Sequence, residues 1–122
     1  MALKYLNTSN NSEVIVIDKR SIQNPLTGQV DNDINAANIN SIVLCNKHAT
    51  DSVTIDLWVR NYVDNGAGGF TETNFYILNN VLVPNGTTLV LDKSYGINFN
   101  NSYKRLYVQL SASDSAVDVI IN

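Results

Sequence analysis

The residues best suited to chemistry in this 122-residue chain are its single histidine, His48, and its single cysteine, Cys45. A Cys–His pair would need a thiolate nucleophile within hydrogen-bond reach of the imidazole. Cys45 closes the apolar run of residues 41–45, which predicts a small buried side chain rather than an activated thiol. His48 stands in a polar segment between two apolar runs, which predicts a turn residue.

Carboxylates offer a second kind of chemistry. Residues 31–35, Asp-Asn-Asp-Ile-Asn, begin like a calcium-binding loop, but Ala36 and Ile42 stand where that loop has its turn glycine and bidentate glutamate. The chain has two glutamates, Glu13 and Glu72, so a glycosidase-type pair would have to rely on aspartates, and no such pairing is visible. The sequence therefore predicts no catalytic residues, no metal site and no cofactor.

Any functional site in this chain must be positioned by short strands, in which apolar and polar side chains alternate. In residues 53–60 the odd positions are aliphatic and the even positions hold Thr, Asp, Trp and Arg, the pattern of a half-buried strand. Seven to nine such strands, separated by turns rich in Asn, Gly, Asp and Ser, predict one all-β domain over residues 1–122. The expected fold is an antiparallel β-sandwich of jelly-roll or immunoglobulin-like type. The remaining predicted strands are 13–17, 39–45, 74–78, 81–83, 87–91, 106–111 and 117–122, with 96–99 as a further candidate.

Three segments fall outside this alternation. Residues 1–11 are predicted as an N-terminal arm, 18–38 as a long irregular segment, and 62–73, with three glycines near Phe70, as an exposed loop. The turn Pro84-Asn85-Gly86 is expected to end one strand, because proline cannot donate to a ladder and Asn-Gly accepts a positive φ.

Aromatic residues on polar strand faces are the main candidates for a binding surface. Trp58 and Tyr107 each lie on the polar face of a predicted strand, and Ile120 follows Asp118 on another. If these strands pair, one outer face carries Trp, Tyr and Ile among charges, which is typical of a protein–protein contact. Alternatively, Trp58 and Tyr107 shield one another across strands or lie under a loop. The predicted interface residues are Leu3, Tyr5, Trp58, Tyr62, Phe70, Tyr107 and Ile120.

Composition narrows the range of partners. The net charge is −3, and the few Lys and Arg residues are scattered, whereas a nucleic-acid footprint needs a concentrated basic face. No segment approaches the roughly 20 apolar residues of a membrane span, and residues 1–10 lack the apolar stretch of a signal peptide. We therefore expect neither nucleic acid nor membrane as a partner. A lone cysteine cannot form an intramolecular disulfide, which fits assembly in a cytosol.

Two stretches, VLVPNGTTLVLD and the closing YVQLSASDSAVDVIIN, resemble a group of small accessory virion proteins of tailed bacteriophages, cyanophages among them. The similarity covers residues 39–122. It implies a β-sandwich that decorates or cements the capsid, or sits at the neck or tail, without catalytic residues. It also implies the major capsid protein or other virion proteins as partners, a homo-oligomer, and localisation to the virion after synthesis and assembly in the host cytoplasm.

The first hypothesis is therefore a non-enzymatic capsid decoration or cement protein, whose many weak contacts sum through multivalency. The first alternative is a neck, tail or fibre protein with the same fold. The second alternative is a carbohydrate-binding module that uses Trp58, Tyr62 or Phe70 as a stacking platform. An enzyme is the least favoured class, because acid–base candidates are so few.

Overall fold

Strands dominate the computed structural model, which describes residues 4–23, 30–32, 39–95, 103–112 and 115–122. A short 3₁₀ helix, η2, follows the seventh strand, and no α-helix occurs in the described ranges. The strands are β1 (Lys4–Thr8), β2 (Val14–Gln23), β3 (Val30–Asn32), β4 (Ser41–Asn46), β5 (Val53–Asp64), β6 (Phe70–Val83), β7 (Thr87–Asp92), β8 (Tyr103–Leu110) and β9 (Val117–Ile121), with η2 at Lys93–Tyr95.

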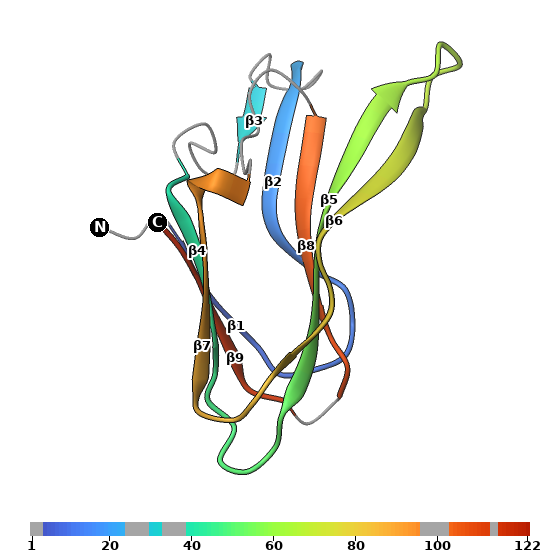
Figure 1. Cartoon of the computed structure of the whole chain (residues 1–122). Helices are drawn as coiled ribbons and strands as arrows, with labels where there is room; N and C mark the ends of the chain where they lie inside the picture. The colour runs from blue at the N-terminus through green and yellow to red at the C-terminus, as the bar shows by residue number, and fades with distance from the viewer. Residues whose placement is uncertain (1–3, 24–29, 33–38, 96–102, 113–114) are drawn as a thin grey trace.

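Two antiparallel sheets pack face to face (Figure 1). One sheet has the order β1-β9-β4-β7. The other has the order β3-β2-β8-β5-β6, in which β3 is a three-residue addition to the edge of four longer strands. The predicted all-β antiparallel sandwich is confirmed.

The strand pairing makes this sandwich a jelly roll. β1 pairs with β9, β2 with β8, β4 with β7 and β5 with β6, so the chain follows one long hairpin that is folded over itself. Successive pairs of this hairpin alternate between the two sheets. An immunoglobulin-like sandwich has a different strand order, so of the two predicted types the structure selects the jelly roll.

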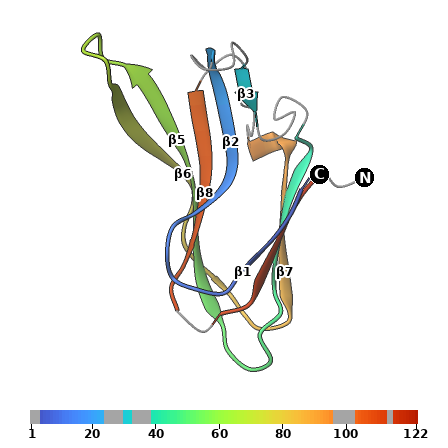
Figure 2. The same cartoon turned by 180° about the vertical axis from the view of Figure 1, so that it is seen from behind.

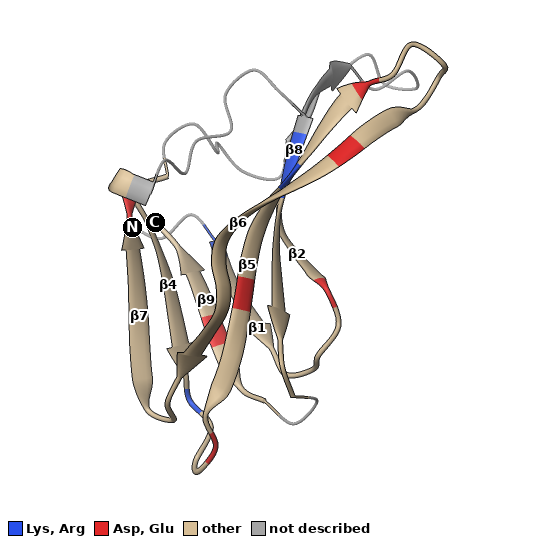
Figure 3. Ribbon diagram, turned by 45° about the vertical axis from the view of Figure 1, so that its right-hand side comes forward, with Lys and Arg blue, Asp and Glu red and all other residues tan. Residues whose placement is uncertain are grey.

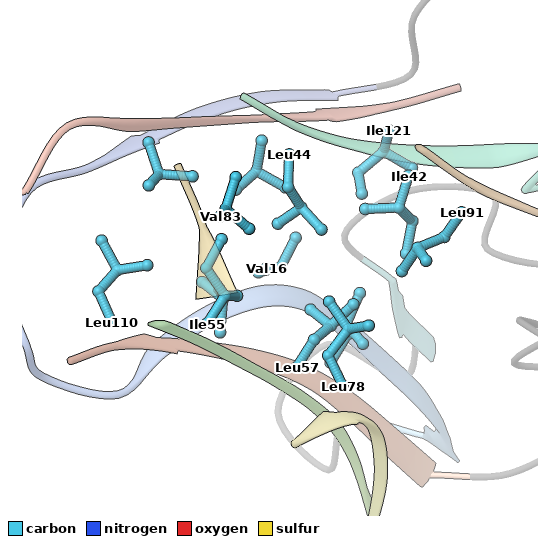
Figure 4. Packing of buried hydrophobic residues seen from close by; sticks show 14 of the residues in the cluster. Val16, Ile42, Leu44, Ile55, Leu57, Leu78, Val83, Leu91, Leu110 and Ile121 are labelled. Carbon is cyan, nitrogen blue, oxygen red and sulfur yellow. The ribbon is translucent and has the colours of Figure 1, made fainter. Parts of the chain in front are cut away.

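Alternating aliphatic side chains from both sheets fill the space between them (Figure 4). On β5 the inward residues are Val53, Ile55 and Leu57, as the sequence pattern predicts, and they are fully or almost fully buried. The inward residues of the opposite sheet come mainly from β4, β7 and β9. The buried core consists of Val16, Ile17, Ile39, Ile42, Leu44, Val53, Ile55, Leu57, Leu78, Val83, Leu91, Leu106, Val108, Leu110, Val117, Val119 and Ile121.

The buried side-chain amide of Asn46 links two chain segments at one end of the sandwich. Asn46 is fully buried at the end of β4, and its side-chain Nδ2 donates to Val83 O at 2.9 Å and to Asp51 O at 3.0 Å. Its Oδ1 accepts a hydrogen bond of 3.1 Å from the backbone N–H of His48. One side chain thus joins the β4–β5 connection to the end of β6.

The predicted N-terminal arm is partly wrong, because Lys4–Thr8 forms β1 at the edge of the first sheet. Its partner is β9, at the opposite end of the chain, in the register Tyr5↔Ile120 and Leu6↔Val119. A pairing between the two ends of a sequence leaves no local signal beyond the alternation itself.

The predicted irregular segment 18–38 is also partly wrong. Residues 18–23 continue β2, and residues 30–32 form β3 beside it, with Lys19 paired to Asn32. Residues 24–29 and 33–38, as well as the candidate strand 96–99, lie outside the described ranges.

The segment 62–73, predicted as a loop, instead forms the outer part of a long hairpin. β5 and β6 pair from Val53↔Val83 to Asp64↔Phe70, which leaves only residues 65–69 as the turn. Asp64 Oδ1 accepts from the Gly66 N–H at 2.8 Å, and Gly66 has a φ of 77° that a glycine adopts without strain. Figures 1 and 2 show this hairpin extending away from the body of the sandwich.

Gly86 has a φ of 70°, so the positive φ predicted for the turn at residues 84–86 is confirmed. The turn does not close a hairpin between its flanking strands, however. β6 pairs with β5 and β7 pairs with β4, so residues 84–86 carry the chain from one sheet to the other.

Candidate protein-interaction surfaces

Trp58 and Tyr107, two of the predicted interface residues, are buried in an aromatic cluster on the outer face of the second sheet. They are cross-strand partners of β5 and β8, and only 2% and 5% of their surfaces are exposed. Their rings stack at a centroid distance of 5.5 Å and an angle of 8°. Tyr76 of β6 covers the other side of Trp58, also at 5.5 Å. The alternative of mutual shielding is therefore confirmed for this pair, and neither ring is available to a partner in the isolated chain.

Two arginines complete this cluster. The guanidinium carbon of Arg60 lies 4.3 Å from the centroid of the Tyr107 ring, and that of Arg105 lies 5.3 Å from the Tyr62 ring. Arg60 is held in place by a 2.8 Å hydrogen bond from Nε to Asn74 Oδ1. Although Arg60 and Arg105 are cross-strand neighbours, each cation faces an aromatic ring, which is a favourable arrangement. The cluster therefore joins β5, β6 and β8 at the base of the hairpin.

Tyr62 and Tyr107, whose hydroxyls lie 3.3 Å apart, have pKa values that shift in opposite directions. Burial raises the pKa of Tyr62, and its hydrogen bond to Tyr107 raises it further. Burial also acts to raise the pKa of Tyr107, but hydrogen bonds from Tyr62 and Arg105 and the charges of Arg105 and Arg60 outweigh it and lower the pKa. Tyr107 is therefore the phenol of this pair that loses its proton first.

This order is open to measurement by ultraviolet absorbance during an alkaline titration. In the wild-type protein the Tyr107 phenol is expected to ionise below the ordinary tyrosine range, because two arginines stabilise its phenolate. Tyr107→Phe is expected to remove this ionisation. Tyr62→Phe is expected to remove a phenol that ionises above that range. Loss of the same titration step in both variants would contradict the assignment.

The hypothesis that Ile120 shares one outer face with Trp58 and Tyr107 is wrong, because Ile120 lies on the first sheet, where Tyr5 is its cross-strand partner. Tyr5 pairs with Ile120, Ile120 with Val43, and Val43 with Val90, so these four side chains form one row across the outer face of the first sheet. We call this row the apolar stripe. Tyr5 and Val90 are exposed at its two ends, and Ile120 and Val43 are half-buried between them. Leu3 lies outside the described residues.

A shallow groove of about 280 Å³ runs beside the Tyr5 end of the stripe. Its polar wall contains Asp118, whose Oδ1 accepts from Asn7 Nδ2 at 2.8 Å and lies 3.1 Å from Lys47 Nζ. The hydrogen bond from Asn7 and the charge of Lys47 lower the pKa of the Asp118 carboxyl. The ionised carboxylate is thus already engaged by neighbouring side chains. The groove is lined by Tyr5, Leu6, Asn7, Asp118, Val119 and Ile120.

The outer half of the β5–β6 hairpin is the third surface, and the sequence identified its Tyr62, which is buried, and its Phe70. Phe75 and Tyr76 are consecutive in β6, so their side chains point to opposite faces, and they are 58% and 53% exposed. Val63 is exposed on the same face as Phe75. Phe70 is exposed on the other face and meets Tyr62 edge to face at 6.3 Å. The sequence signal that could have identified this surface is the adjacent pair Phe75 and Tyr76. Two consecutive aromatic residues place one ring on each face of a strand, so neither face is purely polar.

His48 and Cys45 do not form a reactive pair. The Nδ1 of His48 accepts backbone hydrogen bonds from Thr50 at 3.1 Å and Asp51 at 2.9 Å, so the imidazole orders the connection between β4 and β5, as predicted for a turn residue. Cys45 is half-buried on the outer face of β4, and the prediction of a small buried side chain is therefore wrong. A pocket of about 200 Å³ beside His48 is lined by Asn46, His48, Asp51, Ser52, Val53, Ala112 and Ser115.

Within the described ranges, no group of three or more His, Cys, Asp or Glu side chains is arranged to hold a metal ion. The calcium-loop-like residues 31–35 fall mostly outside those ranges. Nor does the described part of the chain contain a helix with the length and apolar character needed to cross a membrane. No known family model and no curated protein matches the chain.

The carbohydrate-binding alternative named Trp58, Tyr62 or Phe70 as a stacking platform. Such a platform needs ring faces that are open to a sugar. Trp58 and Tyr62 are buried by their neighbours, and of the three predicted platform residues only Phe70 is exposed.

Proposed function

We propose that the chain is a non-enzymatic structural protein of a bacteriophage virion, a decoration or cement protein that binds the shell of major capsid protein. The β5–β6 hairpin is the binding element. The observation that carries this proposal is a hairpin that extends from the sandwich (Figure 1) and whose aromatic side chains are exposed on both of its faces.

Exposed aromatics on both faces of a hairpin call for a partner that surrounds it. In the body of the sandwich each sheet has one face on the core. Phe75, opposite Val59 at the margin of this core, and Val63, farther toward the hairpin tip, are exposed on the face that points inward lower down the strands. Burial of apolar surface is worth roughly 25 cal/mol per Å², so a crevice between neighbouring shell subunits would gain from both faces at once.

The buried aromatic cluster supports the same role, because it stiffens the base of the hairpin. Trp58 and Tyr107 stack there, and Arg105 Nη1 lies within 3.3 Å of the Tyr62 hydroxyl. A preorganised hairpin loses little conformational freedom on binding, which leaves more of the contact energy as affinity.

Fold and sequence resemblance add support of a more general kind. Jelly rolls occur in viral capsid proteins and in lectins, although a fold by itself does not fix a function. The resemblance of residues 39–122 to accessory proteins of tailed bacteriophages favours the first of these. A symmetric shell offers many identical sites, so weak individual contacts sum to a large stabilisation.

Add-back to particles lacking the protein tests the proposal. Purified wild-type chain is expected to bind these particles and to raise the temperature at which they release DNA. Phe75→Ser should bind at least tenfold more weakly, because it removes one exposed aromatic from the hairpin. Leu82→Ser is the matched control, since Leu82 is equally exposed on β6 but lies outside the hairpin's outer half.

Particles that are equally robust with and without the protein would reject the cement role. Phe75→Ser binding as well as wild type would reject the hairpin as the binding element. Counting the polypeptide against the major shell protein by mass spectrometry separates a capsid position from a neck or tail position. A copy number that matches the shell sites supports the former, and a single ring of copies rejects it.

A further inference from the structure

The two sheets have four edge strands, and three of them are protected against pairing with another chain. β3 is only three residues long, and β1 is five residues long and starts with Lys4. β6 is interrupted by a bulge near Asn80, which has a φ of 54°. At this bulge the register between β6 and β5 shifts, between Ile55 and Leu57 of β5. Short length, lysine and bulges are the usual devices that blunt a sheet edge.

β7, the fourth edge, has none of these devices. Its six residues, TTLVLD, pair with β4 in an unbroken register and carry no charge before the terminal Asp92. Figure 3 shows β7 at the outer edge of its sheet, with an acidic residue only at its end. No described strand pairs with its other side.

The hydrogen bonds of the neighbouring strands determine which groups β7 presents. Ser41 of β4 and Asn122 exchange two backbone hydrogen bonds, of 3.3 and 2.9 Å, so the backbone groups of Ser41 point toward β9. Direction alternates along an antiparallel strand, so Ile42 and Leu44 point their backbone groups toward β7.

The partners of Ile42 and Leu44 on β7 are Leu91 and Leu89, whose backbone groups are therefore used within the sheet. By the same alternation, Thr88, Val90 and Asp92 direct their N–H and C=O groups to the open edge. Thr88 and Asp92 thus lie two residues before and two residues after Val90.

We propose that β7 pairs edge to edge with β7 of a second copy of the chain, antiparallel about a two-fold axis at Val90. In this register Val90 exchanges both backbone hydrogen bonds with Val90 of the second copy, and Thr88 does so with its Asp92. Among the registers that align outward-directed groups, this one uses all three residues on each side. Two four-stranded sheets then become one continuous sheet.

Side chains and charges fit a second copy. The apolar stripe ends at Val90, which is 57% exposed, and the two-fold axis joins it to the stripe of the other copy in a single row. The only charge on the strand, Asp92, faces a neutral Thr88, so no like charges lie opposite one another. Because the interface is isologous, pairing closes at a dimer. The pairing goes beyond the proposed virion role and does not rest on it.

Sedimentation analysis of the purified chain tests this pairing. A concentration-dependent dimer is expected. Val90→Lys should weaken it at least tenfold, because two lysines then stand directly opposite each other at the axis. Leu82→Lys, at a 62% exposed position on the other sheet and outside the outer half of the hairpin, should leave the dimer unchanged. A monomer at all concentrations up to about 1 mM, open polymers, or equal effects of both variants would overturn the proposal.

Oxidative cross-linking tests the register, and it does not depend on the lysine variant. In a Cys45→Ala background, Val90→Cys should form a covalent dimer, because a hydrogen-bonded pair has Cα atoms about 5.5 Å apart, within disulfide range. Thr88→Cys should not, because it faces Asp92 of the other copy and lies about 14 Å from its own counterpart. Absence of cross-linking at Val90, or equal cross-linking at both positions, would contradict the two-fold axis.

Discussion

Replacing Trp58 with alanine is expected to lower the free energy of unfolding by about 4 kcal/mol, the usual cost of emptying the site of a buried large aromatic. Trp58 is 2% exposed and lies between the rings of Tyr76 and Tyr107. Its removal leaves a cavity and separates two rings that it joins. Because a domain of this size is stable by about 5–15 kcal/mol, the loss is a large fraction of the total.

Urea denaturation followed by far-ultraviolet circular dichroism measures this loss without needing the indole signal. Trp58→Phe is the matched control: it keeps a stacked ring, and the indole Nε1 it removes has no hydrogen-bond partner in the described part of the chain. It should cost less than about 1.5 kcal/mol. A stability of Trp58→Ala within about 1 kcal/mol of wild type would show that the cluster does not hold the hairpin base.

Asn46→Ala is expected to produce the second-largest effect, about 3 kcal/mol, because it leaves buried backbone groups without partners. The side chain is fully buried and serves three backbone groups, namely Val83 O, Asp51 O and His48 N. An unsatisfied buried polar group costs more than the hydrogen bond that it loses. The β4–β5 connection and the end of β6 should therefore loosen together.

Thermal and urea unfolding of Asn46→Ala and Asn85→Ala, side by side, provide the comparison. Asn85 is exposed and its Nδ2 makes a single 3.3 Å hydrogen bond to Ala49 O, so its replacement should change stability by less than about 0.5 kcal/mol. If the two variants unfold at the same urea concentration, Asn46 does not act as the tie between these segments.

The β5–β6 hairpin and the β7 edge are two separate candidate contact surfaces. The aromatic–arginine cluster packs β5, β6 and β8 together, whereas Phe75, opposite Val59 on the other face, and Phe70, nearer the tip, are exposed. The β7 edge lies on the opposite sheet, so a dimer formed there leaves both hairpins accessible. A paired form with two hairpins would gain in avidity if both reach sites on the same shell.

The strand content and the inward-facing residues could be predicted because they depend on local alternation. Val53, Ile55 and Leu57 are buried where the period of two placed them. The same reasoning failed for Lys4–Thr8, since the strand that completes its pairing is β9. It also failed at 62–73, where turn-forming glycines are confined to a short tip and the flanking residues pair as strands.

By itself, the sequence determined that this is an all-β protein, that Val53, Ile55 and Leu57 face the core, and that Gly86 takes a positive φ, because each of these follows from neighbouring residues. Only the tertiary structure decided that the sandwich is a jelly roll and that Trp58 is internal while Phe75 and Val90 are exposed. Those outcomes depend on which distant strand lies alongside, and a polar-face aromatic is buried or exposed according to the rings beside it. Alternation specifies two faces of a strand, and the partner strands decide which of them remains open to solvent.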